Sequence, residues 1–337
     1  MSSQYDLELN KIRDLVQIKS YSKILIQMPE GMLDLPLKTL VEELSSLDTE
    51  VILSGDPSYG ICDLAIDLAK RLNCDLLIHF GHTEFGFDNR FRSQTGKTLD
   101  VLLIPATVSV DISSFTEQLA NELKLLKWVK VGLIATAQHL NLISKLNEFL
   151  LSKGFQPIIK GEGQILGCNL SNIRYDFDDI DGIIGLHAGN FHTHGIILST
   201  TIPILQLDPY SGKMTFFGVK ERNRLIKKRY SIIHKARNAQ FWGILGSSKI
   251  GQYHPLQMKH AKKLLTQHNK SRISIIAENT NHQSLSNIAW VEAWVDTACP
   301  RLIDDQISYP IPILNFREFL YIFDEISWEE LLKNGFL

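Results

Sequence analysis

Short apolar runs alternate with amphipathic stretches along almost the whole chain. The runs have the length of buried strands, and the stretches between them repeat apolar residues at helical spacing, as Leu64, Leu68 and Leu72 do. This alternation predicts an α/β protein with parallel sheets. The expected strands are 23–28, 51–53, 76–80, 101–104, 129–135, 156–159, 182–186, 202–207, 241–245, 273–277 and 289–295, and the expected helices are 35–44, 64–72, 138–153, 220–237, 254–267 and a last one after Ser327.

The stretch 51–86 is the most informative of these units. It reads as strand, turn-rich loop, amphipathic helix and second strand. In such units, ligands bind at the loops beyond the carboxyl ends of the strands. Cys62, His79 and His82 all fall at that end, so the chemistry is expected where these loops converge.

Three of the four cysteines follow predicted strands, one in each third of the chain: Cys62, Cys168 and Cys299. Cys62 and Cys168 also share a Gly–acidic pair seven and six residues upstream, which is internal similarity or chance recurrence. Each thiol alone is most simply a small buried hydrophobe, as Cys74 is expected to be. A thiol at a helix N-terminus, however, loses its proton more readily. Three thiolates could then hold a metal or cluster with one position open.

Composition narrows the class of protein. A length of 337 residues predicts two or three domains, and 44% hydrophobic with 21% charged residues is ordinary for a globular protein. The net charge of -2 provides no general attraction to nucleic acid or anionic membrane. Asp6 and Glu8 do not suit a signal peptide, and polar residues interrupt the charge-free run 182–207, so neither secretion nor a membrane span is expected. Four cysteines fit a reducing cytoplasm.

Histidine pairs and a basic stretch leave alternatives open. His79 with His82, and His192 with His194, have the spacing of zinc ligands, yet substrate contact or a structural role explains them as well. The basic stretch 220–237 is by default a solvated helix face. The other interpretation is a docking surface for an acidic macromolecule.

Several blocks together resemble the signature blocks of the diphthamide synthesis family. They are 55–63, 79–82, 161–168 and 295–301, with further similar blocks at 189–192, 207–210 and 242–246. The block Asp296-Thr297-Ala298-Cys299-Pro300-Arg301, together with the block around Cys62, is highly specific. The resemblance runs from about Ile24 to Pro312, nearly the whole chain.

The resemblance implies a fold and a cluster. The expected fold is three similar Rossmann-like α/β domains whose parallel sheets surround a central cluster site. The expected domains are 1–110 with Cys62, 111–215 with Cys168 and 216–337 with Cys299. Each of these cysteines is expected to bind a 4Fe–4S cluster, whose fourth iron is left for S-adenosylmethionine.

The resemblance also implies an activity. The reduced cluster would cleave the bond between the sulfur and the γ-carbon of S-adenosylmethionine, and the resulting 3-amino-3-carboxypropyl radical would add to imidazole C2 of a histidine in translation elongation factor 2. This is the first step of diphthamide biosynthesis, and archaeal members of the family act as homodimers with an electron donor. Two alternatives are a noncatalytic iron–sulfur partner subunit and a zinc hydrolase that uses the same thiolates.

Loops expected around the cofactor supply the other candidate residues. Backbone amides there suit its carboxylate, and acidic groups suit its cationic centre. The candidates are Gln27, Pro29, Glu30, Asp56, Tyr59, Gly60, His79, Gly81, His82, His187, Gly189, His192, Asp208, Pro209, Gly246, Gly251 and Gln252.

Overall fold

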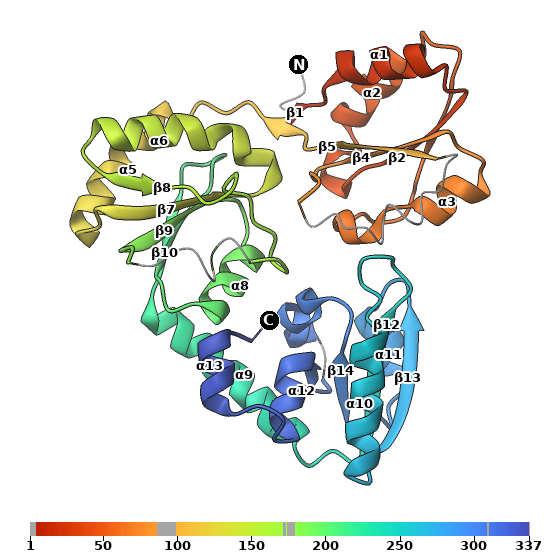
Figure 1. Ribbon diagram of the computed structural model, residues 1–337, viewed down its shortest axis with the longest axis vertical. Coiled ribbons are helices and arrows are strands. Elements are labelled where there is room, and N and C mark those ends of the chain that lie inside the picture. The colour runs from red at the N-terminus through yellow and green to blue at the C-terminus, as the bar shows by residue number, and fades with distance from the viewer. Residues whose placement is uncertain (1–4, 86–98, 171–172, 174–178, 309, 337) are drawn as a thin grey trace.

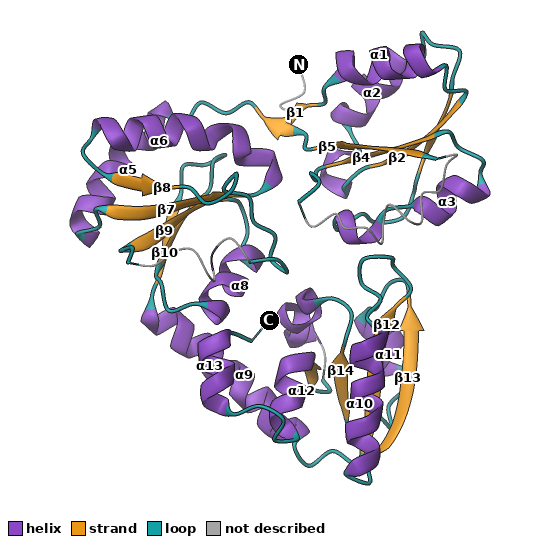
Figure 2. Ribbon diagram, viewed as in Figure 1, coloured by secondary structure: helices purple, strands orange, loops and turns teal. Residues whose placement is uncertain are grey.

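A computed structural model describes every residue except 1–4, 86–98, 171–172, 174–178, 309 and 337. The described strands form one two-stranded pair and three larger, mainly parallel sheets of four, five and four strands. Each larger sheet is flanked by helices, and the three resulting units are arranged around a common centre (Figures 1 and 2). This architecture confirms the predicted α/β class. No helix in the described part of the chain has the length and apolar character needed to cross a membrane.

The first unit contains a fully parallel sheet in the order β3-β2-β4-β5. Ile24 and Ile26 pack under α1 and α2, whereas the intervening Leu25 packs towards α3, because successive side chains of a strand face opposite sides. The elements of the first unit are α1 (Leu9–Lys19), β2 (Lys23–Gln27), η1 (Glu30–Met32), α2 (Leu35–Leu44), β3 (Glu50–Leu53), η2 (Ile61–Asp63), α3 (Ile66–Arg71), β4 (Leu76–Phe80) and β5 (Asp100–Ile104).

A short antiparallel pair closes this unit. β1 (Tyr5–Asp6) pairs with β6 (Thr107–Val108), so the start of the chain is fastened to the segment that leaves the first sheet. The hydrophobic pattern does not predict this pair, because two residues are too few to show a period.

The second unit contains a sheet in the order β11-β10-β9-β7-β8, in which only β11 is antiparallel to its neighbour. The helix expected at 138–153 instead begins as a 3₁₀ segment and becomes α-helical at Ile143. The elements of the second unit are α5 (Ser113–Leu126), β7 (Lys130–Ala135), η3 (Ala137–Leu142), α6 (Ile143–Ser152), β8 (Gln156–Ile158), β9 (Gly182–Leu186), α8 (Phe191–Ser199), β10 (Ile204–Leu207) and β11 (Met214–Phe217).

The third unit contains a parallel sheet in the order β13-β12-β14-β15. The last helix begins as expected, because Ser327 Oγ accepts a hydrogen bond from the Glu330 amide at 3.0 Å. The elements of the third unit are α9 (Val219–Ala236), β12 (Phe241–Ser247), α10 (Pro255–Gln267), β13 (Ser271–Ala277), α11 (His282–Ser286), β14 (Ala293–Asp296), η4 (Pro300–Ser308), β15 (Ile313–Asn315), α12 (Phe316–Ile322) and α13 (Trp328–Asn334).

The basic helix α9 is only partly a solvated face. Arg229 is buried, and its guanidinium donates to both carboxylate oxygens of the buried Glu318, at 2.7 and 2.5 Å. Arg222 donates to the carbonyl oxygens of Thr200 and Leu332, both at 3.1 Å. These two arginines therefore fasten the helix between the second and third units, which corrects the expectation of a uniformly solvated face.

Candidate active site

Cys62 lies in the loop that follows β3, inside the short η2 turn. The turn is fixed by the Asp63 carboxylate, which accepts the amides of Tyr59 at 3.0 Å and Gly60 at 3.3 Å. These bonds close the chain tightly around the cysteine, so the position of its sulfur is set by the backbone.

The third unit reaches across to the same turn through the loop after β12. Lys249 Nζ forms an ion pair with Asp63 at 3.1 Å, with side-chain exposures of only 7% and 3%. The Gly251 amide donates to the Cys62 carbonyl at 2.8 Å, and Gln252 Nε2 donates to Cys62 Sγ at 3.2 Å. Cys62 is therefore held by two units of the protein at once.

Cys168 lies at the tip of a tight two-residue hairpin after β8. Leu166 and Asn169 exchange both backbone hydrogen bonds, at 3.2 and 3.0 Å. Gly167 has no room for a side chain, because a Cβ there would lie 2.2 Å from the ring of Phe191. The hairpin therefore rests on the first residue of α8.

Cys299 follows β14 in a loop organised by Asp296. The buried Asp296 carboxylate accepts the Ala298 amide at 2.8 Å, and Thr297 Oγ1 donates to the Leu245 carbonyl at 2.7 Å. Burial raises the pKa of Asp296 to about 7, although the amides of Ala298 and Cys299 oppose this shift.

The three thiols belong to one electrostatic site. Burial raises the pKa of Cys62 to about 11 and that of Cys299 to about 12, and the neighbouring cysteines add to both shifts. Although solvent reaches Cys168, desolvation also raises its pKa. Contrary to the expectation of acidified thiols, desolvation raises the pKa of all three. Deprotonating these thiols requires positive charge at the site, such as iron supplies.

The described residues do not form a ready-made site for a single metal ion. Among the described residues, no three His, Cys, Asp or Glu side chains converge closely enough to hold a single metal ion. A multi-iron cluster holds its cysteines at separate corners, so the sulfurs need not converge on one point.

An aromatic and cationic wall connects all three units beside the cysteines. The Arg301 guanidinium lies 5.4 Å from the ring centroid of Phe191 and 6.0 Å from that of Tyr59. Lys249 Nζ lies 4.6 Å from the same Tyr59 ring. Arg301, Phe191 and Lys249 were not predicted individually as site residues, although Arg301 and Phe191 stand inside blocks that carried the resemblance.

His79 and His82 form a buried chain with Gln27. His79 Nδ1 lies 2.9 Å from Gln27 Oε1, so it donates, and His79 Nε2 then accepts from His82 Nδ1 at 2.9 Å. Burial lowers the pKa of both histidines. In this arrangement the unprotonated Nε2 of His82 faces the side of Gly60, whose Cβ position would be 3.4 Å from Cys62 Sγ.

His187 and His192 form a second pair, with ring centroids 5.4 Å apart. Burial lowers their pKa values to about 4 and about 3, and the charges of Arg301 and His82 add to the shift of His192. His194 Nδ1 lies 3.5 Å from Asp304 Oδ1, and among the described residues no group of three metal-binding side chains includes His192 and His194.

The structure brings some of the remaining candidates to the cysteines and leaves others apart. Four of them lie at Cys62: Tyr59, Gly60, Gly251 and Gln252. Asp56 instead lines a cavity of about 400 Å³ that none of the three cysteines lines. Asp208 binds Tyr210 and Ser211 within its own turn. Their cofactor contacts remain predictions.

The other predicted residues make contacts of their own, and their roles at the cofactor stay predictions. Gln27 Nε2 donates to the Asp63 carbonyl, and the Gly189 carbonyl accepts from the Gln206 side-chain amide. Pro29 packs against Gly81, and Gly246 adjoins Met258. Glu30 is exposed in η1, whereas Pro209 is buried.

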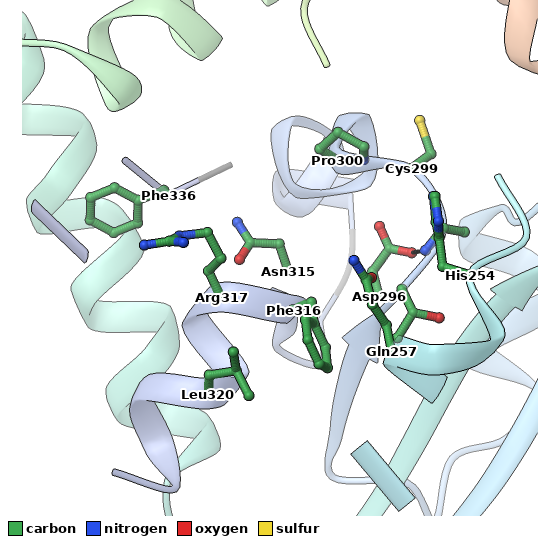
Figure 3. Close-up of a pocket in the computed structure, with 12 residues that line it drawn as sticks. His254, Gln257, Asp296, Cys299, Pro300, Asn315, Phe316, Arg317, Leu320 and Phe336 are labelled. Atoms are coloured by element: carbon green, nitrogen blue, oxygen red, sulfur yellow. Dashed lines mark hydrogen bonds between the residues drawn. The ribbon is translucent and has the colours of Figure 1, made fainter. Parts of the chain in front are cut away.

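Two cavities open beside Cys299. One of about 440 Å³ lies on the side of α12 and is drawn in Figure 3. The other, of about 350 Å³, is lined by Tyr59, Lys249, Gln252 and Arg301. The cysteine site therefore has adjacent space of small-molecule size.

The fold and site together define an α/β protein of three mainly parallel-sheet units, each of which carries one of the cysteines Cys62, Cys168 and Cys299 in a loop. The chain belongs to the diphthamide synthesis family, since residues 28–332 match the family described as "Putative diphthamide synthesis protein".

Relatives with named functions agree with this membership. The chain is 31% identical to 2-(3-amino-3-carboxypropyl)histidine synthase of Pyrococcus horikoshii, over 96% of this chain and 94% of that protein. It is 27% identical to subunit 1 of the human synthase, over 98% of this chain and 74% of that one. The crystal structure of Dph2 from Pyrococcus horikoshii with a 4Fe-4S cluster superposes with a TM-score of 0.82 at 29% identity, covering 96% of this chain and 92% of that one.

Proposed function

We propose that this protein is a 2-(3-amino-3-carboxypropyl)histidine synthase. It transfers the 3-amino-3-carboxypropyl group of S-adenosylmethionine to imidazole C2 of a histidine in translation elongation factor 2, the first step of diphthamide biosynthesis. The observation that carries the proposal is that the chain is 31% identical, over 96% of its length, to a synthase of that name. The electrostatic influence of Cys62 and Cys168 on Cys299 supports it.

The residues present fit a 4Fe–4S cluster. Cys62 and Cys168 both raise the pKa of Cys299, and Gln252 Nε2 donates to the sulfur of Cys62. Amide donors of this kind stabilise cluster thiolates. Cys62, Cys168 and Cys299 would hold the cluster, which when bound supplies the electron for radical chemistry on S-adenosylmethionine.

The surrounding side chains have roles of their own. Arg301 and Lys249, with the rings of Tyr59 and Phe191, close one wall of the site and provide positive charge beside it. Because His82 Nδ1 donates to His79, the Nε2 of His82 carries the lone pair of the ring, which suits the acceptance of a hydrogen bond from a bound ligand.

Reconstitution with one protein tests the proposal directly. The anaerobically purified, reduced protein is incubated with S-adenosylmethionine and elongation factor 2, and the factor is analysed by mass spectrometry. The expected result is one 3-amino-3-carboxypropyl group on one histidine. An unmodified factor in the presence of an intact, reducible cluster would contradict the proposal.

The noncatalytic partner subunit is the competing function, because eukaryotic relatives carry the name subunit 1. The same assay decides between them, since a partner subunit would modify the factor only after a second, related chain is added. We further propose a cytoplasmic homodimer served by a separate electron donor, with domains at 1–110, 111–215 and 216–337. Light scattering and limited proteolysis test the dimer and the boundaries.

A further inference from the structure

The side chain of Gln27 is held in one orientation by two backbone groups. Its Nε2 donates to the Asp63 carbonyl at 2.8 Å, and its Oε1 accepts the Ala65 amide at 3.0 Å. A carbonyl oxygen can only accept and a backbone N–H can only donate, so the oxygen and nitrogen of this side chain cannot exchange places. Because Gln27 is only 3% exposed, the protein itself maintains this orientation.

The fixed oxygen of Gln27 determines which nitrogen of His79 carries a proton. His79 Nδ1 lies 2.9 Å from Gln27 Oε1, and an oxygen that only accepts requires a hydrogen on that nitrogen. His79 is fully buried, and burial lowers its pKa well below the ordinary value, which disfavours a second proton on the ring. His79 Nε2 is therefore an acceptor.

The tautomer of His79 in turn sets that of His82. His82 Nδ1 lies 2.9 Å from His79 Nε2 and donates to it, so the lone pair of the His82 ring lies on Nε2. That nitrogen and Cys62 Sγ border the same space beside Gly60, at 3.8 and 3.4 Å from the point where a Cβ would stand. The network therefore directs a hydrogen-bond acceptor towards the cysteine site.

We propose that Gln27 is a positioning residue which, through His79, keeps His82 Nε2 as the acceptor for a ring N–H of the imidazole that is modified. The inference rests on the proposed function, in which a histidine of elongation factor 2 is modified at C2. Because C2 of an imidazole lies between the two ring nitrogens, binding one ring N–H fixes C2 one bond from the bound nitrogen. A single uncharged acceptor suits a neutral N–H, whereas a buried ammonium requires a counter-charge.

The tautomers can be measured directly in the full-length protein before iron is added. Long-range proton–nitrogen NMR of protein labelled with nitrogen-15 histidine distinguishes a ring nitrogen that carries a proton from one that carries a lone pair. At mildly alkaline pH, we expect Nδ1 to be protonated and Nε2 to be unprotonated in both His79 and His82. A proton on His82 Nε2 in the unaltered protein would overturn the inference.

Two substitutions alter the network in opposite ways. Gln27→Met removes the acceptor from His79 Nδ1, so the His79 proton moves to Nε2 and His82 then carries its own proton on Nε2. His79→Gln places an amide oxygen near the former Nε2, which still accepts from His82 Nδ1 and keeps the lone pair on His82 Nε2. Gln17→Met, at an exposed position of α1, is the matched control and should change neither tautomer.

Each result of this series decides the role of Gln27. The same His82 tautomer in Gln27→Met as in the unaltered protein overturns that role. If Gln27→Met does not fold, because the Asp63 carbonyl and the Ala65 amide lose their partner, the unaltered protein and His79→Gln decide. A proton on His82 Nε2 in His79→Gln would then contradict the inference.

Kinetics of the cluster-loaded protein identify what the acceptor binds. In Gln27→Met, kcat/KM for elongation factor 2 is expected to fall about 5-fold, the effect of one hydrogen bond, while the Kd of S-adenosylmethionine stays within about twofold. An equal loss of affinity for S-adenosylmethionine overturns the assignment of the acceptor to the target imidazole. Expected tautomers in an unaltered protein that does not modify the factor would refute the proposed function and leave the positioning role of Gln27 supported.

Discussion

Cys62 and Cys168 present the same chemical group by different means. Cys62 lies in a turn fixed by a buried ion pair and by two hydrogen bonds from another unit. Cys168 lies at the tip of a hairpin whose backbone bonds are its own, and it depends on the close approach of Gly167 to one ring.

The difference shows which features make the site cooperative. Because Lys249 and Gln252 belong to the third unit, the position of Cys62 depends on the contact between the first and third units. The position of Cys168 depends mainly on packing within the second unit. Substitutions should therefore affect the two cysteines through separable mechanisms.

The largest effect is expected from breaking the buried ion pair. Lys249→Met leaves the Asp63 carboxylate buried without its cation, and loss of one partner of such a pair costs about 3–5 kcal/mol. We expect a lower free energy of unfolding in urea and a lower iron content after reconstitution. Lys262→Met, at an exposed position of α10, is the control, and an equal response of both variants would refute the role of the pair.

A smaller effect is expected at the hairpin. Gly167→Ala places a Cβ 2.2 Å from the Phe191 ring, and overpacking of this kind costs about 1–3 kcal/mol. The displaced hairpin should reduce cluster content while the third unit remains intact. Adding Phe191→Leu removes the clash and should restore much of the iron, as measured by colorimetric iron assay. No recovery in the double variant would show that the ring is not the cause.

The smallest effect is expected at the sulfur hydrogen bond. Gln252→Leu removes the donor at 3.2 Å from Cys62 Sγ, a contribution of about 0.5–1.5 kcal/mol. Reduction adds negative charge, which this donor stabilises, so the midpoint potential should become more negative. Redox titration followed by electron paramagnetic resonance measures the shift, and a potential equal to that of the unaltered protein would contradict a role for Gln252 in tuning the cluster.

The sequence predicts the strands and the cysteine positions, but it does not predict the contacts between distant residues. Alternating apolar runs identify strands such as β2 and β4 because a parallel sheet buried on both faces demands them. The expectation that the three cysteines converge follows from the family blocks and from their places at strand ends. Local pattern alone does not join residues this far apart.

The missed features depend on contacts between distant residues. Arg229 appears solvated in a basic stretch, yet it pairs with Glu318, 89 residues away. The thiols were expected to be acidified, but desolvation in the assembled site raises their pKa values. The role of Lys249 requires its contact with Asp63, 186 residues earlier, and nothing in the local sequence indicates that contact.

The central claim is that three sulfurs from three units hold one cluster. Mössbauer spectroscopy of iron-57-reconstituted Cys62→Ser, Cys168→Ser and Cys299→Ser, beside Cys74→Ser as the control, tests it most directly. We expect the 4Fe–4S signal of the unaltered protein to persist in Cys74→Ser and to be lost or strongly reduced in each of the other three. A full 4Fe–4S signal in any one of those three variants would contradict the account.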